Sequence, residues 1–130
     1  MEIEKPQIIR FPKIGNLSLG YISVAEFENN IPFKIKRVYW IYLTPDEVNR
    51  GFHAHKKLKQ VIIAVSGIIR FNLKNKIGQE LEFILDEPSK GLLIPEMHWR
   101  EISFSHNAVL LCLASEKFDE NDYIRNFKEF

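Results

Sequence analysis

The sequence predicts an all-β fold, a sandwich or a barrel, and two observations support that prediction. Short runs of apolar and β-branched residues recur about every ten residues, and Gly, Pro, Asn or Asp separates one run from the next. The chain has 130 residues, of which 45% are hydrophobic and 27% are charged, a composition that is ordinary for a globular protein with one core. We therefore expect residues 1–130 to form a single domain of short strands.

The predicted strands are the segments in which β-branched and aromatic residues dominate. In chain order they are residues 20–25, 36–43, 61–65, 68–73, 81–85, 91–95 and 109–114. Ser66-Gly67 and residues 75–78 separate neighbouring strands and have the composition of turns, so we expect a hairpin at each. Adjacent strands should then be antiparallel.

The tail, residues 115–130, departs from the strand pattern. Asp119 or Asn121 can cap a short turn or helix near the C-terminus. The residues that would share one side of this element are Tyr123, Ile124 and Phe127. We expect the tail to be the only part of the chain that is not strand and loop.

Charge and composition argue against several classes of partner. Lys and Arg together number 18, and Asp and Glu 17, so the chain lacks the basic field that binds nucleic acid. The N-terminus has no cationic segment followed by an apolar one, and no run approaches the ~18 apolar residues of a membrane span. Cys112 lies in an apolar run, where we expect a small buried hydrophobe rather than a nucleophile. We expect a soluble cytoplasmic protein that binds neither nucleic acid nor membrane.

The motif that points most directly to chemistry is the histidine pair His53 and His55. Side chains at i and i+2 of an extended segment point to the same face of a sheet, so the two imidazoles can converge on one site. The spacing alone permits either a metal site or a proton-transfer pair. The remaining histidines, His98 and His106, have no such partner, and His106 should lie in a turn.

The histidine pair begins a pattern that resembles the first motif of the cupins, a family of small β-barrels. Metal-binding cupins carry a glutamate where this chain has Gln60, and the histidine of their second motif corresponds to Arg100. An amide is a weaker cation ligand than a carboxylate, and a guanidinium repels a divalent ion. The resemblance implies an all-β cupin jelly roll, or double-stranded β-helix, with no metal site, in which both histidines are free for acid–base work. His98 as a substitute ligand leaves a metal-binding alternative open.

Four segments together resemble the dTDP-4-keto-6-deoxyglucose 3,4-ketoisomerases, also grouped as WxcM-like proteins. They are residues 31–39, 50–58, 99–101 and 113–125. The resemblance implies a homodimer whose N-terminal strands exchange between subunits, with no cofactor and with a dTDP-linked keto sugar as substrate. Two positions depart from the family pattern. Leu19 stands where relatives carry a larger polar residue that reaches the sugar, and Trp40 replaces a tyrosine, which we expect to affect only packing.

Moving a ketone from carbon 4 to carbon 3 requires one proton route at carbon and another between the two oxygens, through an enediol or enediolate. Groups with a pKa near neutrality suit both routes. The resemblance assigns the carbon-bound proton to His53 and the oxygen-bound proton to His55. The sequence alone does not show which histidine serves the carbon atoms and which serves the oxygens.

Cations and aromatic residues complete the predicted site. Negative charge on the sugar oxygens needs a fixed cation, for which the candidates are Arg50 and Arg100. The pyrophosphate needs charge-assisted contacts, for which the candidates are Arg37 with Lys56 or Lys57. Two aromatic residues either line the sugar and thymine or belong to the core, and these are Tyr39 and Trp99.

Three alternatives remain open at this level. The first is a metal-dependent cupin enzyme, and the second is a sugar-binding cupin without activity. The third is a sugar 3,5-epimerase, which would call for a histidine–aspartate base and a tyrosine acid, a pattern that the sequence does not reveal. For an isomerase, Arg100 favours the gluco configuration at carbon 4 of the product, and Leu19 weakens that preference.

Overall fold

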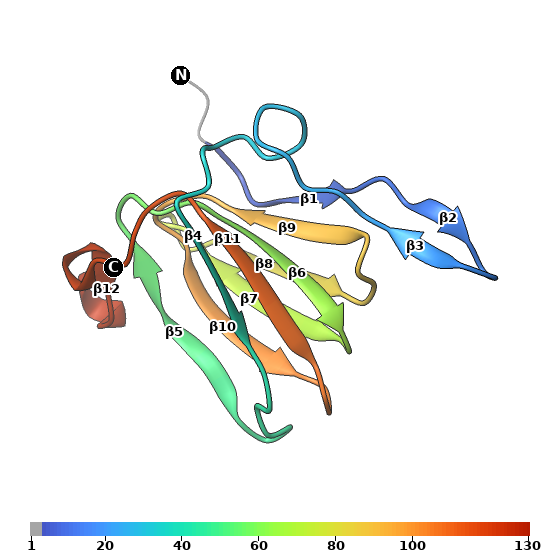
Figure 1. Cartoon of the computed structure of the whole chain (residues 1–130). Helices are drawn as coiled ribbons and strands as arrows, with labels where there is room; N and C mark the ends of the chain where they lie inside the picture. The colour runs from blue at the N-terminus through green and yellow to red at the C-terminus, as the bar shows by residue number, and fades with distance from the viewer. Residues whose placement is uncertain (1–3) are drawn as a thin grey trace.

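The computed structural model describes residues 4–130 and contains two five-stranded sheets and a separate two-stranded hairpin (Figure 1). Residues 1–3, which belong to the predicted domain, lie outside the described residues. The named strands pair in antiparallel fashion throughout residues 4–130. The all-β and antiparallel predictions are confirmed.

The first sheet has the strand order β1-β9-β6-β11-β4. Its strands are β1 (Gln7–Arg10), β9 (Lys90–Ile94), β6 (Gln60–Ser66), β11 (Val109–Ala114) and β4 (Arg37–Ile41). The second sheet has the order β12-β5-β10-β7-β8. Its strands are β12 (Tyr123–Ile124), β5 (Asn49–His55), β10 (Trp99–Phe104), β7 (Ile69–Lys74) and β8 (Glu80–Leu85).

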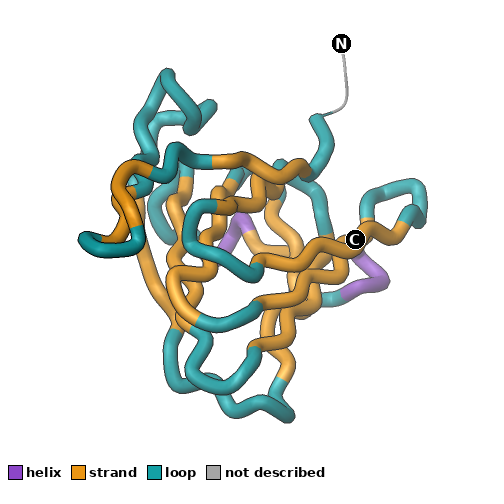
Figure 2. The backbone as a smooth tube through the Cα atoms, turned by 90° about the vertical axis from the view of Figure 1, so that its right-hand side faces the viewer, coloured by secondary structure: helices purple, strands orange, loops and turns teal. Residues whose placement is uncertain are grey.

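The remaining elements lie at the two ends of the chain. The hairpin of β2 (Ile14–Asn16) and β3 (Gly20–Ile22) projects away from the two sheets in Figure 1. The tail contains two single 3₁₀ turns, η1 (Glu120–Asp122) and η2 (Phe127–Glu129), which are the purple segments of Figure 2. No helix within residues 4–130 has the length and apolar character needed to cross a bilayer.

The main core lies between the two sheets, because alternate residues of each strand point inward. β6 contributes Ile62 and Ala64 from the first sheet, and β7 contributes Phe71 and Leu73 from the second. Cys112 of β11 belongs to this core and is fully buried, as predicted. A second apolar layer covers the outer face of the first sheet, where Phe11, Ile31 and Phe33 pack on Val61, Ile63, Leu93 and Leu113.

One predicted hairpin is confirmed and the other is wrong. β7 and β8 pair across residues 75–78, as expected. Ser66-Gly67 does not join a hairpin, because β6 and β7 belong to different sheets. In a jelly roll the chain crosses from one sheet to the other at such a turn. The residues of a turn indicate that the chain reverses direction, but they do not indicate which strand the next strand pairs with. Gly67 is required there, since its φ is +73° and a Cβ atom would lie 2.7 Å from the Cα of Ala108.

The tail is capped as predicted but folds differently after the cap. The side chain of Asp119 accepts a hydrogen bond from the amide of Asn121 at the start of η1. Tyr123 and Ile124 then form strand β12 along the edge of β5, instead of one side of a helix. The free backbone groups at the edge of β5 offer the tail more hydrogen bonds than an isolated turn of helix would.

Candidate functional site

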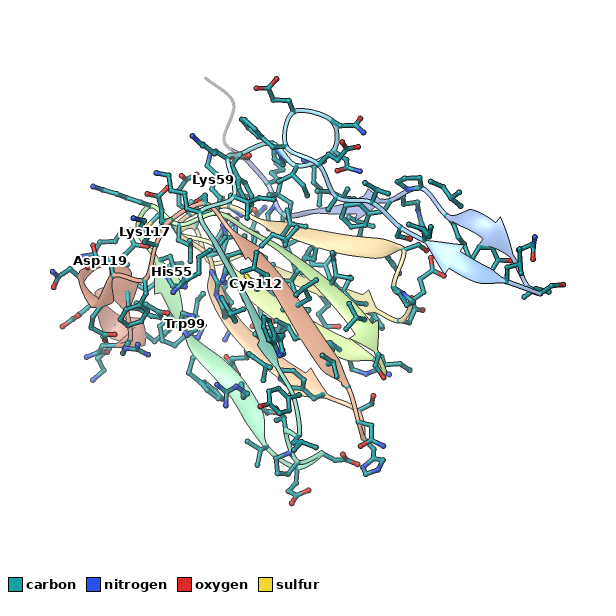
Figure 3. The ribbon with its side chains drawn as sticks, in the orientation of Figure 1. His55, Lys59, Trp99, Cys112, Lys117 and Asp119 are labelled. Atoms are coloured by element: carbon teal, nitrogen blue, oxygen red, sulfur yellow. The ribbon has the colours of Figure 1, made fainter. Side chains whose placement is uncertain are left out.

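The histidine pair lies near the C-terminal end of β5, facing the space between the sheets. The ring centroids of His53 and His55 are 4.8 Å apart, with the rings at 83° to each other. Their predicted position on the same face is therefore confirmed. Figure 3 labels His55 beside the C-terminal segment, which pairs with β5 through β12.

A β-bulge in β5 precedes the pair. Arg100 of β10 is opposite His53, whereas Glu101 is opposite Gly51, so Phe52 is the extra residue. Phe52 has a φ of +56° and Gly51 a φ of +96°. A Cβ atom at Gly51 would lie 2.8 Å from the carbonyl oxygen of Arg100, so a glycine lets the two strands approach here.

His53 is held in one tautomer by its own strand. Its Nδ1 lies 2.9 Å from the carbonyl oxygen of Gly51. A carbonyl oxygen can only accept, so Nδ1 carries the hydrogen and donates it. The other ring nitrogen, Nε2, is therefore the basic one.

A buried polar network lies beside the histidines, where Arg100 stands opposite His53. Arg100 is 2% exposed, and its guanidinium donates to Oε1 of Gln60 and, at 3.1 Å, to the carbonyl oxygen of His98. The amide nitrogen of Gln60 donates in turn to the hydroxyl of Tyr39 at 2.9 Å and to Sγ of Cys112 at 3.3 Å. A hydrogen bond thus joins Gln60 and Arg100, the residues at the two altered cupin positions.

The donors at this position suit an internal cation better than a metal ion. Gln60 offers its one carbonyl oxygen to Arg100, and the guanidinium supplies the positive charge. Within residues 4–130, no group of three or more His, Cys, Asp or Glu side chains converges in the way that a metal site requires. His98 points its Nδ1 at the carbonyl oxygen of Glu96, 2.9 Å away.

Burial and the Arg100 guanidinium together keep both histidines neutral. Burial, followed by the charge of Arg100, lowers the pKa of His53 to about 4 and that of His55 to about 2. Burial also raises the pKa of Tyr39 well above its usual value, and that of the Cys112 thiol to about 11. At neutral pH the site therefore holds two neutral imidazoles, which can accept protons, beside the buried cation Arg100.

Arg37 of β4 has the features of a ligand-binding cation. Its guanidinium carbon lies 5.2 Å from the ring centroid of Tyr39 and 5.7 Å from that of Phe118. Its Nε is buried and has no hydrogen-bond partner among residues 4–130. A buried donor of this kind is costly unless something accepts its hydrogen.

Two residues of the tail join the histidines, and sequence reasoning missed both. The ring of Tyr123 lies 5.0 Å from that of His53 and 4.4 Å from that of His55, centroid to centroid. Oδ2 of Asp122 lies 3.4 Å from Nδ1 of His55. The structure therefore contains a histidine–aspartate pair that the sequence did not reveal. The two residues are far apart in sequence, and only the β5–β12 pairing brings them together.

The remaining predicted site residues are Arg50, Lys56 and Trp99. Arg50 and Lys56 are exposed on either side of the histidine pair. Trp99 is buried against Phe127 and Phe130, with ring centroids 5.2 and 6.1 Å away, which favours a packing role. The structure therefore leaves the binding roles of these three residues as predictions.

The two positions that depart from the family pattern are both on the surface. Leu19 is 86% exposed in the turn before β3, and Trp40 is 60% exposed on the outer face of β4. The expectation that Trp40 affects only packing stays a prediction, since the ring is largely uncovered in the single chain. His106 lies in the turn between β10 and β11, as predicted.

Comparison with known proteins gives a consistent result over nearly the whole chain. The pattern of the family described as "FdtA: WxcM-like, C-terminal" matches residues 4–130. The chain is 44% identical over 126 residues to the TDP-4-oxo-6-deoxy-alpha-D-glucose-3,4-oxoisomerase of Aneurinibacillus thermoaerophilus, covering 95% of this chain and 88% of that protein.

Solved structures of similar proteins share the fold. QdtA, a sugar 3,4-ketoisomerase from Thermoanaerobacterium thermosaccharolyticum solved in complex with TDP, is 42% identical, with a TM-score of 0.90 over 95% of this chain and 90% of that one. The WlaRB TDP-quinovose 3,4-ketoisomerase from Campylobacter jejuni is 39% identical, with a TM-score of 0.90 over 98% and 97%. The predicted jelly roll is confirmed by these matches.

Proposed function

Since the chain belongs to the family described as "FdtA: WxcM-like, C-terminal", we propose that it is a sugar-nucleotide 3,4-ketoisomerase. Its substrate is dTDP-4-keto-6-deoxyglucose, and its product is a dTDP-3-keto-6-deoxyhexose for the synthesis of deoxyamino-sugar glycans. The observation that supports this best is the pair of neutral imidazoles, His53 and His55, beside the buried cation Arg100. An enediol mechanism needs these groups: two that exchange protons and one fixed positive charge.

The two histidines divide the proton transfers. Nε2 of His53 removes the proton from carbon 3, because its Nδ1 is already committed to the carbonyl oxygen of Gly51. Hydrogens 3 and 4 project from opposite faces of a gluco ring, so the gluco product requires that carbon 4 receive its proton from the other face, from a second donor or after the ring has turned in the site. His55 takes the proton of the carbon 3 hydroxyl and delivers it to the carbon 4 oxygen. Each proton removed from one position is replaced at the other, so the reaction consumes no acid, base or cofactor.

Arg100 stabilises the intermediate in place of a metal ion. Its charge lies inside the barrel, where a fixed cation has a stronger effect on an enediolate oxygen than it would in water. Gln60 and the carbonyl oxygen of His98 hold the guanidinium still, so that little reorganisation is needed when charge develops. We propose a reaction that requires no metal.

The remaining predicted residues bind the nucleotide and the sugar. Arg37, with its buried unpaired Nε, is suited to the pyrophosphate, and Lys56 lies on the exposed turn beside the site. Arg50 is a second exposed cation near His53. Tyr39 and Trp99 are the aromatic candidates, of which Tyr39 is connected to the polar network and Trp99 to the aromatic cluster.

We also propose a cytoplasmic homodimer of single-domain subunits, residues 1–130, that exchange their N-terminal strands. The β2–β3 hairpin supports this, because two strands of three residues are too short to be stable alone. Its apolar side chains are uncovered, namely Ile14, Leu17, Leu19, Tyr21 and Ile22. The outer face of β4 also leaves Val38 and Trp40 exposed. A second copy of the chain would therefore cover apolar surface both on the hairpin and on β4.

One experiment tests the reaction. The purified chain is incubated with dTDP-4-keto-6-deoxyglucose in deuterium oxide, and the product is followed by NMR. We expect a 3-keto sugar labelled at carbon 4, with the large coupling between hydrogens 4 and 5 that indicates the gluco configuration. The 39% identity to the TDP-quinovose enzyme supports that configuration, in addition to Arg100.

The same experiment, repeated with a binding measurement and after EDTA treatment, separates the alternatives. Label at carbon 5 with an unmoved ketone would indicate a 3,5-epimerase. An unchanged substrate that nevertheless binds would indicate a sugar-binding cupin. Activity lost on treatment with EDTA and restored by one divalent ion would contradict the metal-free proposal.

A further inference from the structure

The carboxylate of Asp122 ties the tail to the turn that follows His55. Its Oδ1 accepts a hydrogen bond from the amide of Lys57 at 2.8 Å, and its Oδ2 accepts from the amide of Leu58 at 3.2 Å. The backbone carbonyl of Asp122 also accepts from the amide of Lys56 at 2.9 Å. Three successive amides after His55 are therefore fixed by one residue, which leaves the carboxylate little freedom to move.

The same carboxylate faces the histidine ring. Oδ2 of Asp122 lies 3.4 Å from Nδ1 of His55, and their side chains are 12% and 2% exposed. No residue between 4 and 130 makes a regular hydrogen bond to this buried Nδ1. A carboxylate can only accept, so it favours the tautomer with hydrogen on Nδ1 and the lone pair on Nε2.

We propose that Asp122 is a positioning residue for His55, which holds its ring in the Nδ1–H tautomer and stabilises its imidazolium. The proposal rests on the proposed function, because it assigns Asp122 a part in the oxygen-to-oxygen proton transfer. When Nε2 takes the proton of the carbon 3 hydroxyl, an imidazolium forms beside Asp122. The ring becomes neutral again when the same proton moves to the carbon 4 oxygen.

The charges around His55 explain why a carboxylate is needed. The groups that oppose its protonation come from several elements, and they are Arg100 of β10, His53 of β5, Arg37 of β4 and Arg125 of the tail. An imidazolium among these groups has one close anionic partner, the Asp122 carboxylate. Asp122 thus supplies the counter-charge that the barrel interior lacks.

The test uses Asp122→Asn, which keeps the size of the side chain. An asparagine oxygen can still accept from the amide of Lys57, but its NH₂ then faces Nδ1 of His55 and requires that nitrogen to accept. We expect the tautomer to reverse and kcat to fall on the order of 10²-fold or more, with KM nearly unchanged. Rate assays with dTDP-4-keto-6-deoxyglucose and ¹⁵N NMR of the histidine rings measure the two effects.

Asp119→Asn is the matched control. Asp119 lies three residues earlier in the same tail and caps η1 through the amide of Asn121, a bond that asparagine makes equally well. We expect this variant to keep both the wild-type rate and the wild-type His55 tautomer.

Two results would overturn the proposal. One is a wild-type spectrum in which Nε2 of His55 carries the hydrogen, and this measurement still decides if Asp122→Asn fails to fold. The other is a folded Asp122→Asn variant that retains wild-type kcat. The spectrum is recorded without substrate, so an inactive wild-type protein with the expected tautomer would count against the proposed function and not against the placement of Asp122.

Discussion

The two sheets of this small barrel differ in how far their outer faces are shielded from solvent. In the first sheet, β6 has five buried residues in succession and β9 has four, so both faces are covered. In the second sheet, β7 alternates between buried residues and the more accessible Arg70, Asn72 and Lys74. A sheet that alternates faces water on one side, whereas a sheet that is apolar on both sides needs a cover. The outer face of the first sheet therefore requires other residues to shield it from water, whereas the outer face of the second sheet can face water.

The inner faces, in contrast, contribute jointly to the site. The second sheet supplies His53, His55 and Arg100, and the first sheet supplies Tyr39 and Gln60. Substitutions on inner faces should therefore change the chemistry, while those on the outer face of the first sheet should change assembly. The predictions below test this division.

The largest effect should come from the inner face of β5. We expect His53→Asn and His55→Asn each to fold normally and to lose turnover on the order of 10²-fold or more, because each removes a general acid–base group. His106→Asn, in an exposed turn, is the control and should keep the wild-type rate. Steady-state assays of the three variants measure this, and wild-type rates in both β5 variants would mean that the pair is structural.

The next effect concerns Arg37, on the inner side of β4. A charge-assisted contact to phosphate is worth about 1.5–3 kcal/mol, so Arg37→Ala should raise KM roughly 10- to 100-fold with a smaller change in kcat. Arg70→Ala, on the exposed side of β7, should leave both constants unchanged. An unaltered KM for Arg37→Ala would show that another cation binds the pyrophosphate.

A smaller effect is expected from the outer face of the first sheet. An aromatic residue at the centre of an interface contributes about 2 kcal/mol or more, so Trp40→Lys should weaken the proposed dimer roughly 30-fold. Ile84→Lys, at a 41% exposed position on the outer face of the second sheet, should not. Sedimentation at several concentrations compares them. Equal dimer dissociation constants for the two variants would show that the outer faces of the two sheets do not differ in their contribution to assembly.

The smallest effect is on stability in acid. The pKa values of His53 and His55 lie near 4 and 2, below the ordinary value of about 6.5 that they regain on unfolding. At pH values between the folded-state and the unfolded-state pKa of each histidine, the unfolded chain binds more protons than the folded chain. The free energy of unfolding therefore falls as the pH drops below about 6.5, by at most about 1.4 kcal/mol per pH unit for each histidine. Above that pH the two histidines contribute no pH dependence.

Thermal melts between pH 7 and pH 5 measure this slope. His53→Asn should show a shallower decline in Tm than the wild-type chain, and His106→Asn should show the wild-type decline. The same slope in all three proteins would mean that His53 titrates in the folded state as it does in the unfolded chain.

Much of the architecture was predictable because local composition determines it. The buried strands β6, β9 and β11 are continuous apolar runs, which identified them directly. β5 and β10 were not among the predicted strands, because charged and aromatic residues interrupt their apolar pattern. The crossing at Ser66-Gly67 was misread because strand partners are chosen by packing between distant segments.

The site was predictable to the extent that its residues form a local motif. His53 and His55 lie two residues apart and could be recognised from that spacing, and Arg100 and Gln60 from the motif positions they replace. Asp122 and Tyr123 gave no such signal, since short polar segments near a C-terminus are usually solvated. Their contact with the histidines depends on a strand pairing of two residues, which no periodicity could indicate.

The bulge at Phe52 also sets the phase of the strand. Side chains directly opposite on neighbouring strands share a face, so His53 points inward because it stands opposite the buried Arg100. If β5 kept all of its residues in a regular ladder, Phe52 would take that place and both histidines would turn toward solvent. Deleting Phe52 would instead remove the bulge and leave His53 in its place opposite Arg100. The two-against-one pairing at the bulge therefore determines which face of β5 carries His53 and His55.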